Sequence, residues 1–266
     1  MPPICILTDT AAQFIHSPFL GKDLVQIIPL ESIESNNAEG YRLSAPADKE
    51  LQVILKAASQ KSETVFAIIS SGYLSTLPNQ IFRLIKESPT APRIVIIDSL
   101  SIGIGTGYLV EKTAEMAANG EGSSEIERKI RKLCSAIYTA VIMPELSLLV
   151  PLGLVDRAQA NAAAILGIQS VFSMEEGLPT PMVKVRNRHN AYEYLLEFMD
   201  EFDKFHLVAL VQESVSEVSD LQVINEHLSE FFPHVNLLSF TTNENWLTIF
   251  GRKSYGLVLI SNEENV

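Results

Sequence analysis

Three clusters of hydroxyl and carboxyl side chains follow short apolar runs in the first hundred residues. They are Thr8-Asp9-Thr10, the segment 70–76 and Asp98-Ser99-Leu100-Ser101. In an open α/β sheet, ligands usually bind beyond the carboxyl ends of the strands, where such clusters would gather. Hydroxyls and backbone N–H groups near helix starts can hold a carboxylate or phosphate without a buried positive charge. The sequence therefore predicts a polar ligand site at this edge of a sheet.

Helix capping is the competing interpretation of these clusters, because Ser, Thr and Asp are also the residues that cap helices. For any one of these side chains taken singly, capping alone is the simpler reading. The segment 70–76 is different, because it holds Ser70, Ser71, Ser75 and Thr76 within seven residues. We expect a functional role for this segment.

Other chemistries find little support in the residue pattern. The five histidines do not pair with another His, Cys or Glu at metal-ligand spacing, so no metal site is expected; they are His16, His189, His206, His227 and His234. The glycines of Gly103-Ile-Gly105-Thr-Gly107 lack the spacing of a dinucleotide fingerprint and indicate close helix–sheet packing instead. Ser75 has no Gly-x-Ser-x-Gly surround, which disfavours a serine hydrolase. We expect no catalytic residue and no cofactor.

Composition narrows the class of protein. The chain has 266 residues, with 20 Lys and Arg against 32 Asp and Glu, for a net charge of −12. This charge repels phosphate backbones and anionic lipids, so nucleic-acid binding and polybasic membrane attachment are disfavoured. Two cysteines cannot build a disulfide framework and fit a reducing compartment. The start lacks a secretory signal and no apolar run is long enough to span a membrane. The expected location is the cytoplasm.

The elements that must position the clusters alternate between strands and helices. Apolar runs at 4–9, 64–69 and 93–98 read as strands buried on both faces, and 24–30 is a further candidate. We expect a helix that starts with Ser44 as its cap, a long helix over 102–118, and a helix over 125–137 capped by Ser123 or Ser124. This order predicts a mainly parallel sheet flanked by helices.

The pattern of apolar and polar residues changes in the second half of the chain. Residues 169–186 alternate and carry Glu176-Gly177, which predicts an antiparallel hairpin. Helical patterns at 192–202 and 215–231 alternate with strand patterns at 139–143, 206–211, 235–240 and 257–260. A turn is expected at 36–40. The fold class is therefore α/β with two α/β domains, the first mainly parallel and the second with a mixed or antiparallel sheet. We place the domains at 1–150 and 151–266.

Taken in order, these motifs resemble the DegV family of bacterial fatty-acid-binding proteins. Thr8-Asp9-Thr10 is similar to the family's opening Thr-Asp-Ser, and Leu43-Ser44-Ala45-Pro46 to its Thr-Ser-Gln-Pro. The segment 70–76 resembles its Ser-Ser-x-Leu-Ser-Gly-Thr loop with one residue inserted. Asp156-Arg-Ala-Gln-Ala160 and Lys184-Val-Arg-Asn-Arg188 resemble Ser-Arg-Ala-Gln-Ala and Lys-Val-Arg-Gly-Arg. The resemblance spans nearly the whole chain and depends on the order and spacing of the pieces.

The resemblance implies two α/β domains with a long-chain fatty acid, or a similar acyl lipid, in a tunnel between them. Some members present that acid to a fatty acid kinase. The family holds the carboxylate with a Thr, a Ser, an Arg and a His. Ser75 matches the serine, whereas Leu43, Leu154 and Ile249 stand at the positions of the other three. The identity of the head group is therefore left open, while tail burial at about 0.8 kcal/mol per methylene would survive these losses.

We expect a non-enzymatic lipid-binding protein. Its expected ligand-binding residues are Ser75, Thr76 (through its amide), Ser44, Ser71 and Asp9. The alternative is a transferase or hydrolase for a small metabolite, with Asp9, Asp98 and Ser75 in an open polar cleft. A third possibility is a member with a collapsed pocket and a purely interaction role.

Overall fold

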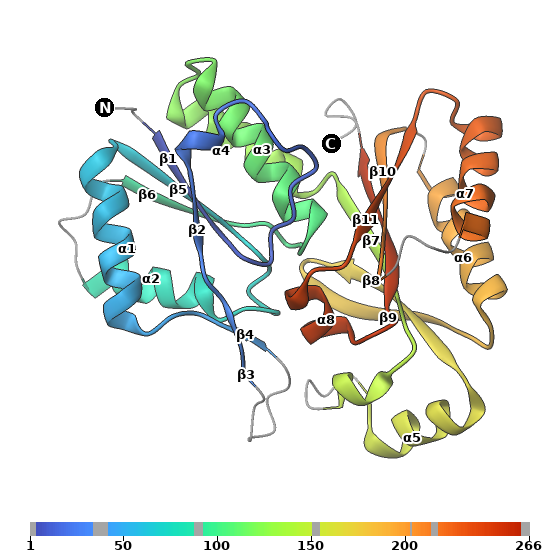
Figure 1. Cartoon of the computed structure of the whole chain (residues 1–266). Coiled ribbons are helices and arrows are strands. Elements are labelled where there is room, and N and C mark those ends of the chain that lie inside the picture. The colour runs from blue at the N-terminus through green and yellow to red at the C-terminus, as the bar shows by residue number, and fades with distance from the viewer. Residues whose placement is uncertain are drawn as a thin grey trace. The chain divides into compact units, whose positions relative to one another are not determined.

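The computed structural model describes residues 4–33, 42–87, 93–150, 155–202, 204–213 and 218–261. The chain divides into two compact units (Figure 1). The first contains the described residues up to 33 and from 42 to 135, and the second those from 136 onward. The division thus precedes the strand β7 (Ile137–Met143), which the sequence analysis placed in the first domain. The physical reason is that β7 pairs with two strands of the second unit, β12 and β8.

The first unit is built on a parallel sheet of four strands in the order β2-β1-β5-β6. Their bounds are Ile4–Asp9 for β1, Val25–Ile28 for β2, Thr64–Ile69 for β5 and Arg93–Asp98 for β6. Every residue of β1 and β5 is buried. A strand buried on both faces reads as a continuous apolar run. The expected limits 4–9, 64–69 and 93–98 agree with the observed strands, and the predicted fold class is confirmed. The expectation that 93–98 is buried on both faces is wrong, because β6 is an edge strand in which buried residues alternate with partly exposed ones.

Helices cover this sheet. They are α1 (Asp48–Lys61), α2 (Leu77–Glu87), α3 (Ile104–Ala118) and α4 (Ser123–Cys134). One apolar cluster joins α1 and α2 to β1 and β5, and includes Leu51, Leu55, Leu77 and Ile81. The α3 helix packs on the sheet and against α4. Gly107 of α3 lies so close to the segment after β1 that an added Cβ would stand 1.9 Å from the Gln13 carbonyl oxygen. Close packing is therefore the role of this glycine.

Two expected caps are wrong. Ser44 does not begin α1 but ends the strand β4 (Arg42–Ser44), which pairs with β3 (Glu31–Ile33). Pro46 favours an extended residue before it, so the helix starts only at Asp48. Likewise α4 begins at Ser123 itself, with Gly122 at its N-cap and no side-chain cap, and it ends at Cys134 rather than near residue 137. A short 3-10 turn, Lys22–Leu24, precedes β2.

The second unit has a mixed sheet of six strands in the order β11-β10-β12-β7-β8-β9. The bounds not yet given are Gln169–Glu175 for β8, Leu178–Val185 for β9, Phe205–Gln212 for β10, Asn236–Thr241 for β11 and Tyr255–Ser261 for β12. Only β10 and β11 run parallel. Glu176 and Gly177 join β8 to β9 with φ of 48° and 85°. Two left-handed residues suit a tight two-residue hairpin turn, so the predicted hairpin is confirmed.

The helices α6 (Arg188–Asp200) and α7 (Val218–Phe231) cover one face of this sheet (Figure 1). Their apolar sides close a core with Leu195, Ile224, Leu228 and Leu257. The sequence analysis did not expect α8 (Glu244–Phe250). Trp246 of α8 is 1% exposed, and its Nε1 donates to Ser254 Oγ at 3.1 Å, so this tryptophan is a core residue.

The remaining elements of the second unit are α5 (Arg157–Leu166) and the short 3-10 turn Leu146–Leu149. The expected turn at 36–40 lies outside the described residues.

Candidate functional site

Asp9 fastens the end of β1 to the segment 70–76. Its Oδ2 accepts the Ser70 backbone N–H at 2.7 Å, and its Oδ1 accepts the Ser70 hydroxyl and the Ala11 N–H at 2.9 Å each. Asp9 and Ser70 are fully buried. Burial raises the pKa of the Asp9 carboxyl, while the bonds from Ser70 and Ala11 act in the opposite direction. The carboxylate is thus occupied by the protein's own donors, and Asp9 positions the segment.

Asp98, at the end of β6, holds the same segment from a second strand. Its Oδ2 accepts the Gly72 N–H at 3.0 Å, and its Oδ1 accepts the Leu100 N–H at 2.9 Å. A Cβ at Gly72 would lie 3.0 Å from Asp98 Oδ2, so glycine allows this close approach. Two carboxylates, at the ends of the strands on either side of β5, therefore fix the first half of the segment through its backbone.

Residues 71–75 then form one tight turn. The Ser71 carbonyl accepts the N–H groups of Leu74 and Ser75, both at 2.9 Å. The Ser71 N–H donates to the Ser101 carbonyl at 2.8 Å, and its Oγ accepts the Tyr73 N–H at 3.2 Å. Ser71, expected to bind ligand, is buried and supports the turn.

The strand β4 braces the second half of the segment. The Leu43 N–H donates to the Leu74 carbonyl at 2.8 Å, and the Thr76 N–H donates to the Leu43 carbonyl at 3.0 Å. Leu43 and Ser75 are consequently paired as a parallel bridge. Thr76 Oγ1 accepts the Ala45 N–H at 3.0 Å. The Thr76 amide, expected to help a head group, is therefore committed to Leu43, while its hydroxyl oxygen holds β4.

Ser44 makes a weaker local contact. Its hydroxyl donates to the neighbouring Ala45 carbonyl at 3.3 Å, and the side chain is half-buried. It lies next to Leu43 in β4, so it is close in the chain to the bridge at Ser75. Ser44 is thus placed beside the segment without fastening it.

Ser75 stands at the centre of this arrangement. It is fully buried, and its Oγ accepts the Leu77 N–H at 3.2 Å where α2 begins. Among the described residues the Ser75 hydroxyl donates to no acceptor, and no histidine or carboxylate is hydrogen-bonded to it. Ser75 therefore offers a buried O–H donor but has no general base beside it, which a nucleophilic serine would need.

The structure thus brings four of the five predicted site residues into one hydrogen-bonded system: Ser71, Ser75, Thr76 and, through Ser70, Asp9. Ser44 lies beside this system. Sequence reasoning missed the bracing role of Leu43, because it acts through its backbone and 31 residues separate it from Leu74. Of the family positions considered above, Ile249 is buried in α8. Leu154 lies outside the described residues.

Two neighbouring threonines of the first cluster differ in their surroundings. Thr10 Oγ1 accepts the Leu30 N–H at 2.9 Å. The Thr8 hydroxyl is buried without a partner among the described residues. Asp9 is the residue of the first cluster that fastens the segment 70–76, through its two bonds from Ser70.

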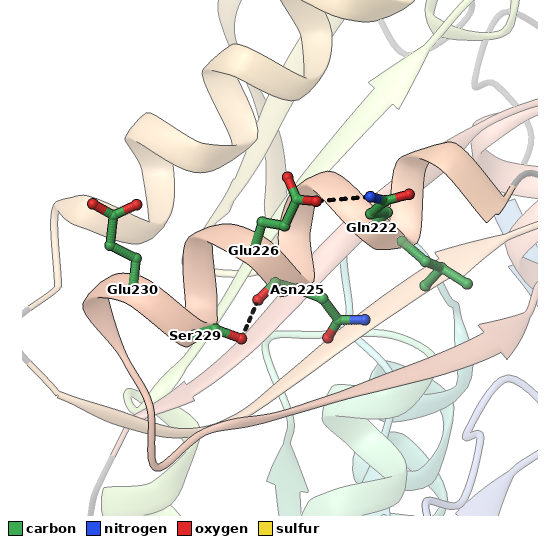
Figure 2. Close-up of a pocket in the computed structure, with 6 residues that line it drawn as sticks. Gln222, Asn225, Glu226, Ser229 and Glu230 are labelled. Carbon is green, nitrogen blue, oxygen red and sulfur yellow. Dashed lines mark hydrogen bonds between the residues drawn. The ribbon is translucent and has the colours of Figure 1, made fainter.

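A separate hollow of about 650 Å³ lies along α7 (Figure 2). Its lining comes from this single helix: Leu221, Gln222, Asn225, Glu226, Ser229 and Glu230. Gln222 Nε2 donates to Glu226 Oε1 and Ser229 Oγ donates to the Asn225 carbonyl, both at 2.7 Å. This hollow lies on the exposed flank of one helix, and it holds no buried donor comparable to Ser75.

Within the described part of the chain, no group of three or more His, Cys, Asp or Glu side chains is arranged to hold a metal ion. None of the helices in these segments combines the length and apolar character needed to cross a bilayer.

Comparison with known proteins identifies the family to which this chain belongs. The model of the DegV family, described as an uncharacterised protein family, matches residues 22–262. A DegV domain-containing protein of Staphylococcus aureus strain COL is 24% identical over 181 residues, which are 68% of this chain and 64% of that relative's length. A DegV domain-containing protein of Lactococcus lactis is 26% identical over 158 residues, covering 58% of this chain and 54% of the relative.

Solved structures share the fold. A fatty acid binding DegV family protein from Streptococcus agalactiae superposes with a TM-score of 0.80 at 18% identity, covering 97% of this chain and 99% of that one. The Fatty Acid Kinase (Fak) B3 protein of Streptococcus pneumoniae, loaded with linoleic acid, gives 0.77 at 16% identity, with coverage of 97% and 99%. Because the family model covers most of the sequence, this chain belongs to the DegV family.

Proposed function

We propose that this protein is a lipid-binding protein that holds one long-chain fatty acid or a related acyl lipid. Relatives with the same fold are described as fatty acid binding, and one is loaded with linoleic acid. The observation that carries the proposal to this chain is the buried Ser75 hydroxyl, whose proton has no acceptor among the described residues. A ligand oxygen would satisfy it, since a buried donor left unpaired is unfavourable by about 1–3 kcal/mol.

We propose that the residues around Ser75 divide into contact and support. Ser75 contacts the head group, and the Thr76 hydroxyl, whose oxygen already accepts the Ala45 N–H, and Ser44 lie near it. Asp9 and Ser71 act indirectly, because their polar atoms hold the segment in place. The affinity comes chiefly from the tail, because each buried methylene contributes about 0.8 kcal/mol whereas one neutral hydrogen bond contributes about 1 kcal/mol.

We further propose that the protein carries lipid without transforming it. Asp9 and Asp98 each accept two backbone N–H groups or more, so neither is poised as a general base for Ser75. A fatty acid kinase is the partner class that the Streptococcus pneumoniae relative's name suggests. Two buried, unpaired cysteines fit a place in the reducing cytoplasm.

Mass spectrometry of an organic extract from the purified, denatured protein tests the proposal. We expect one long-chain lipid per chain, and uptake of added oleic acid after lipid removal. Ser75→Ala should lower the affinity for oleic acid roughly 2- to 10-fold, the effect of one lost hydrogen bond. Ser62→Ala is the matched control, because Ser62 is a buried serine of the same unit that donates to the Ala58 carbonyl at the end of α1. No lipid in the extract and no uptake would refute the proposal and favour a collapsed pocket.

A further inference from the structure

The donors that the segment 70–76 can offer to a head group are hydroxyls. The Ser75 and Thr76 oxygens already accept the N–H groups of Leu77 and Ala45, at 3.2 and 3.0 Å. Each hydroxyl proton donates to no acceptor within the described residues. The backbone amides of Leu74, Ser75 and Thr76 are all used inside the protein. Recognition at this place therefore rests on neutral O–H groups.

An apolar side chain stands next to these donors. Leu43 is fully buried and is bridged directly to Ser75, with hydrogen bonds of 2.8 and 3.0 Å on either side of the bridge. Residues paired across neighbouring strands lie side by side, so the leucine borders the Ser75 hydroxyl. A charged head group at this position would lose water and gain no ionic partner from Leu43.

Two acidic side chains hold the backbone of this segment a few residues before Ser75. Asp9 and Asp98 bind the backbone at Ser70 and Gly72, five and three residues before Ser75. The tight turn from the Ser71 carbonyl to the Ser75 N–H, at 2.9 Å, folds that stretch back onto Ser75. The segment 70–76 itself contains no Lys, Arg or His. Like charges in a poorly solvated site repel strongly, so a second, ligand carboxylate here is disfavoured.

From these three observations we infer that the head group held at Ser75 is bound in an uncharged form: a protonated acid, or the oxygen of a long-chain alcohol, amide or ester. The inference rests on the proposed function and narrows its ligand class. The acyl tail supplies the affinity, and the two hydroxyls select a neutral hydrogen-bond acceptor over an anion. The bound lipid therefore resembles a fatty acid in its tail but not in its charge.

A competition experiment tests the inference. Lipid-free protein at pH 8 receives an equimolar mixture of oleyl alcohol, oleamide and sodium oleate, which share one tail. The protein is re-isolated by gel filtration, and the retained lipids are quantified by mass spectrometry. We expect the two neutral lipids together to exceed oleate by at least 10-fold. Oleate retained as well as, or better than, the neutral lipids would overturn the inference and leave the proposed function standing. Retention of none of the three would overturn both.

A variant that removes one negative charge tests whether electrostatic repulsion causes the preference for neutral lipids. Asp98→Asn keeps a side-chain oxygen for the Gly72 N–H but removes one negative charge, so the neutral-to-oleate ratio should fall several-fold. Asp23→Asn is the matched control, because Asp23 is an exposed carboxylate of the same unit and its loss should not change the ratio. An unchanged ratio in a folded Asp98→Asn protein, shown by an unaltered circular dichroism spectrum, would contradict the electrostatic part of the inference.

Discussion

The Asp9 carboxylate binds Ser70 twice, through the backbone N–H at 2.7 Å and through the hydroxyl at 2.9 Å. Sixty-one residues separate the two in sequence, and the contact joins the ends of the adjacent parallel strands β1 and β5. The segment that carries Ser75 leaves β5 at this point. The position of the proposed ligand donor therefore depends on a carboxylate that itself has no room for ligand.

Replacing Asp9 with Asn should destabilise the protein by about 2–4 kcal/mol, because the amide puts N–H groups where the carboxylate accepts from Ser70 and Ala11. Urea unfolding at pH 7 measures this loss. Asp23→Asn, an exposed carboxylate of the same unit, should change the unfolding free energy by no more than about 0.5 kcal/mol. Equal stability of the two variants would show that Asp9 does not fasten the segment.

The same pair of proteins should differ in pH dependence. Burial raises the pKa of Asp9 above its ordinary value of 3.8. The folded protein then keeps a proton that the unfolded chain releases, so Asp9 lowers stability as the pH rises from 3.8 through the raised folded pKa. The Asn variant lacks this titration. The stability advantage of the wild type over Asp9→Asn should therefore be greatest at acid pH and narrow as the pH rises. A gap that widens over this range would contradict the raised pKa.

Thr76→Val should cost about 1–2 kcal/mol, because the buried Ala45 N–H loses its acceptor at 3.0 Å while the side-chain volume is kept. Thr76→Ser keeps the oxygen and should recover most of that stability. The comparison uses the urea midpoint of each variant together with the affinity for added lipid. If both variants behave like the wild type, the bond from β4 to the segment contributes nothing to either property.

Gly107→Ala should cost more than about 3 kcal/mol, because the new Cβ would meet the Gln13 backbone at 1.9 Å and backbone atoms cannot move aside cheaply. Gly122→Ala is the control, since nothing lies within 4 Å of an added Cβ there. As Gly122 is the N-cap of α4, its replacement should cost about 1 kcal/mol at most. Thermal unfolding of both variants shows which substitution destabilises the protein more. A Gly107→Ala protein as stable as Gly122→Ala would disprove the close approach.

The two thiols should be unreactive in the folded protein. Burial raises the pKa of Cys134 to about 12 and also raises that of Cys5, so neither forms the thiolate that attacks a disulfide reagent at pH 8. We expect no fast reaction with Ellman's reagent in native buffer and two thiols per chain in 8 M urea. Rapid labelling of either cysteine in the native protein would contradict this prediction.

The sequence could predict the elements whose signal is local. The strands at 4–9, 64–69 and 93–98 each contain a run of at least four consecutive apolar or β-branched residues, and Glu176-Gly177 predicts the hairpin. The α5 helix was not predicted from its periodicity, because only Ala160 and Ala163 of its residues are buried. Its Asp156/Gln159 capping box was the available signal.

The site could be predicted only in part. The clustering of hydroxyls at 70–76 is visible in one stretch of sequence, and it led to Ser75. The division into ligand donors and supports is not visible there, because it depends on contacts such as Asp9 with Ser70 and Leu43 with Leu74. Ser44 was assigned to a helix cap because Ser before Pro and Asp commonly starts a helix. Pairing of β4 with β3 and with the segment overrides that local preference.

Trp246 is the chain's single tryptophan, and it is buried in the second unit with its indole N–H on Ser254. Its fluorescence is therefore a built-in optical reporter of that unit alone. The first unit has no tryptophan, whereas far-ultraviolet circular dichroism reports on both units. If the two units unfold independently, the thermal transitions recorded by the two methods should have different midpoints. If the units unfold together, the two transitions should coincide.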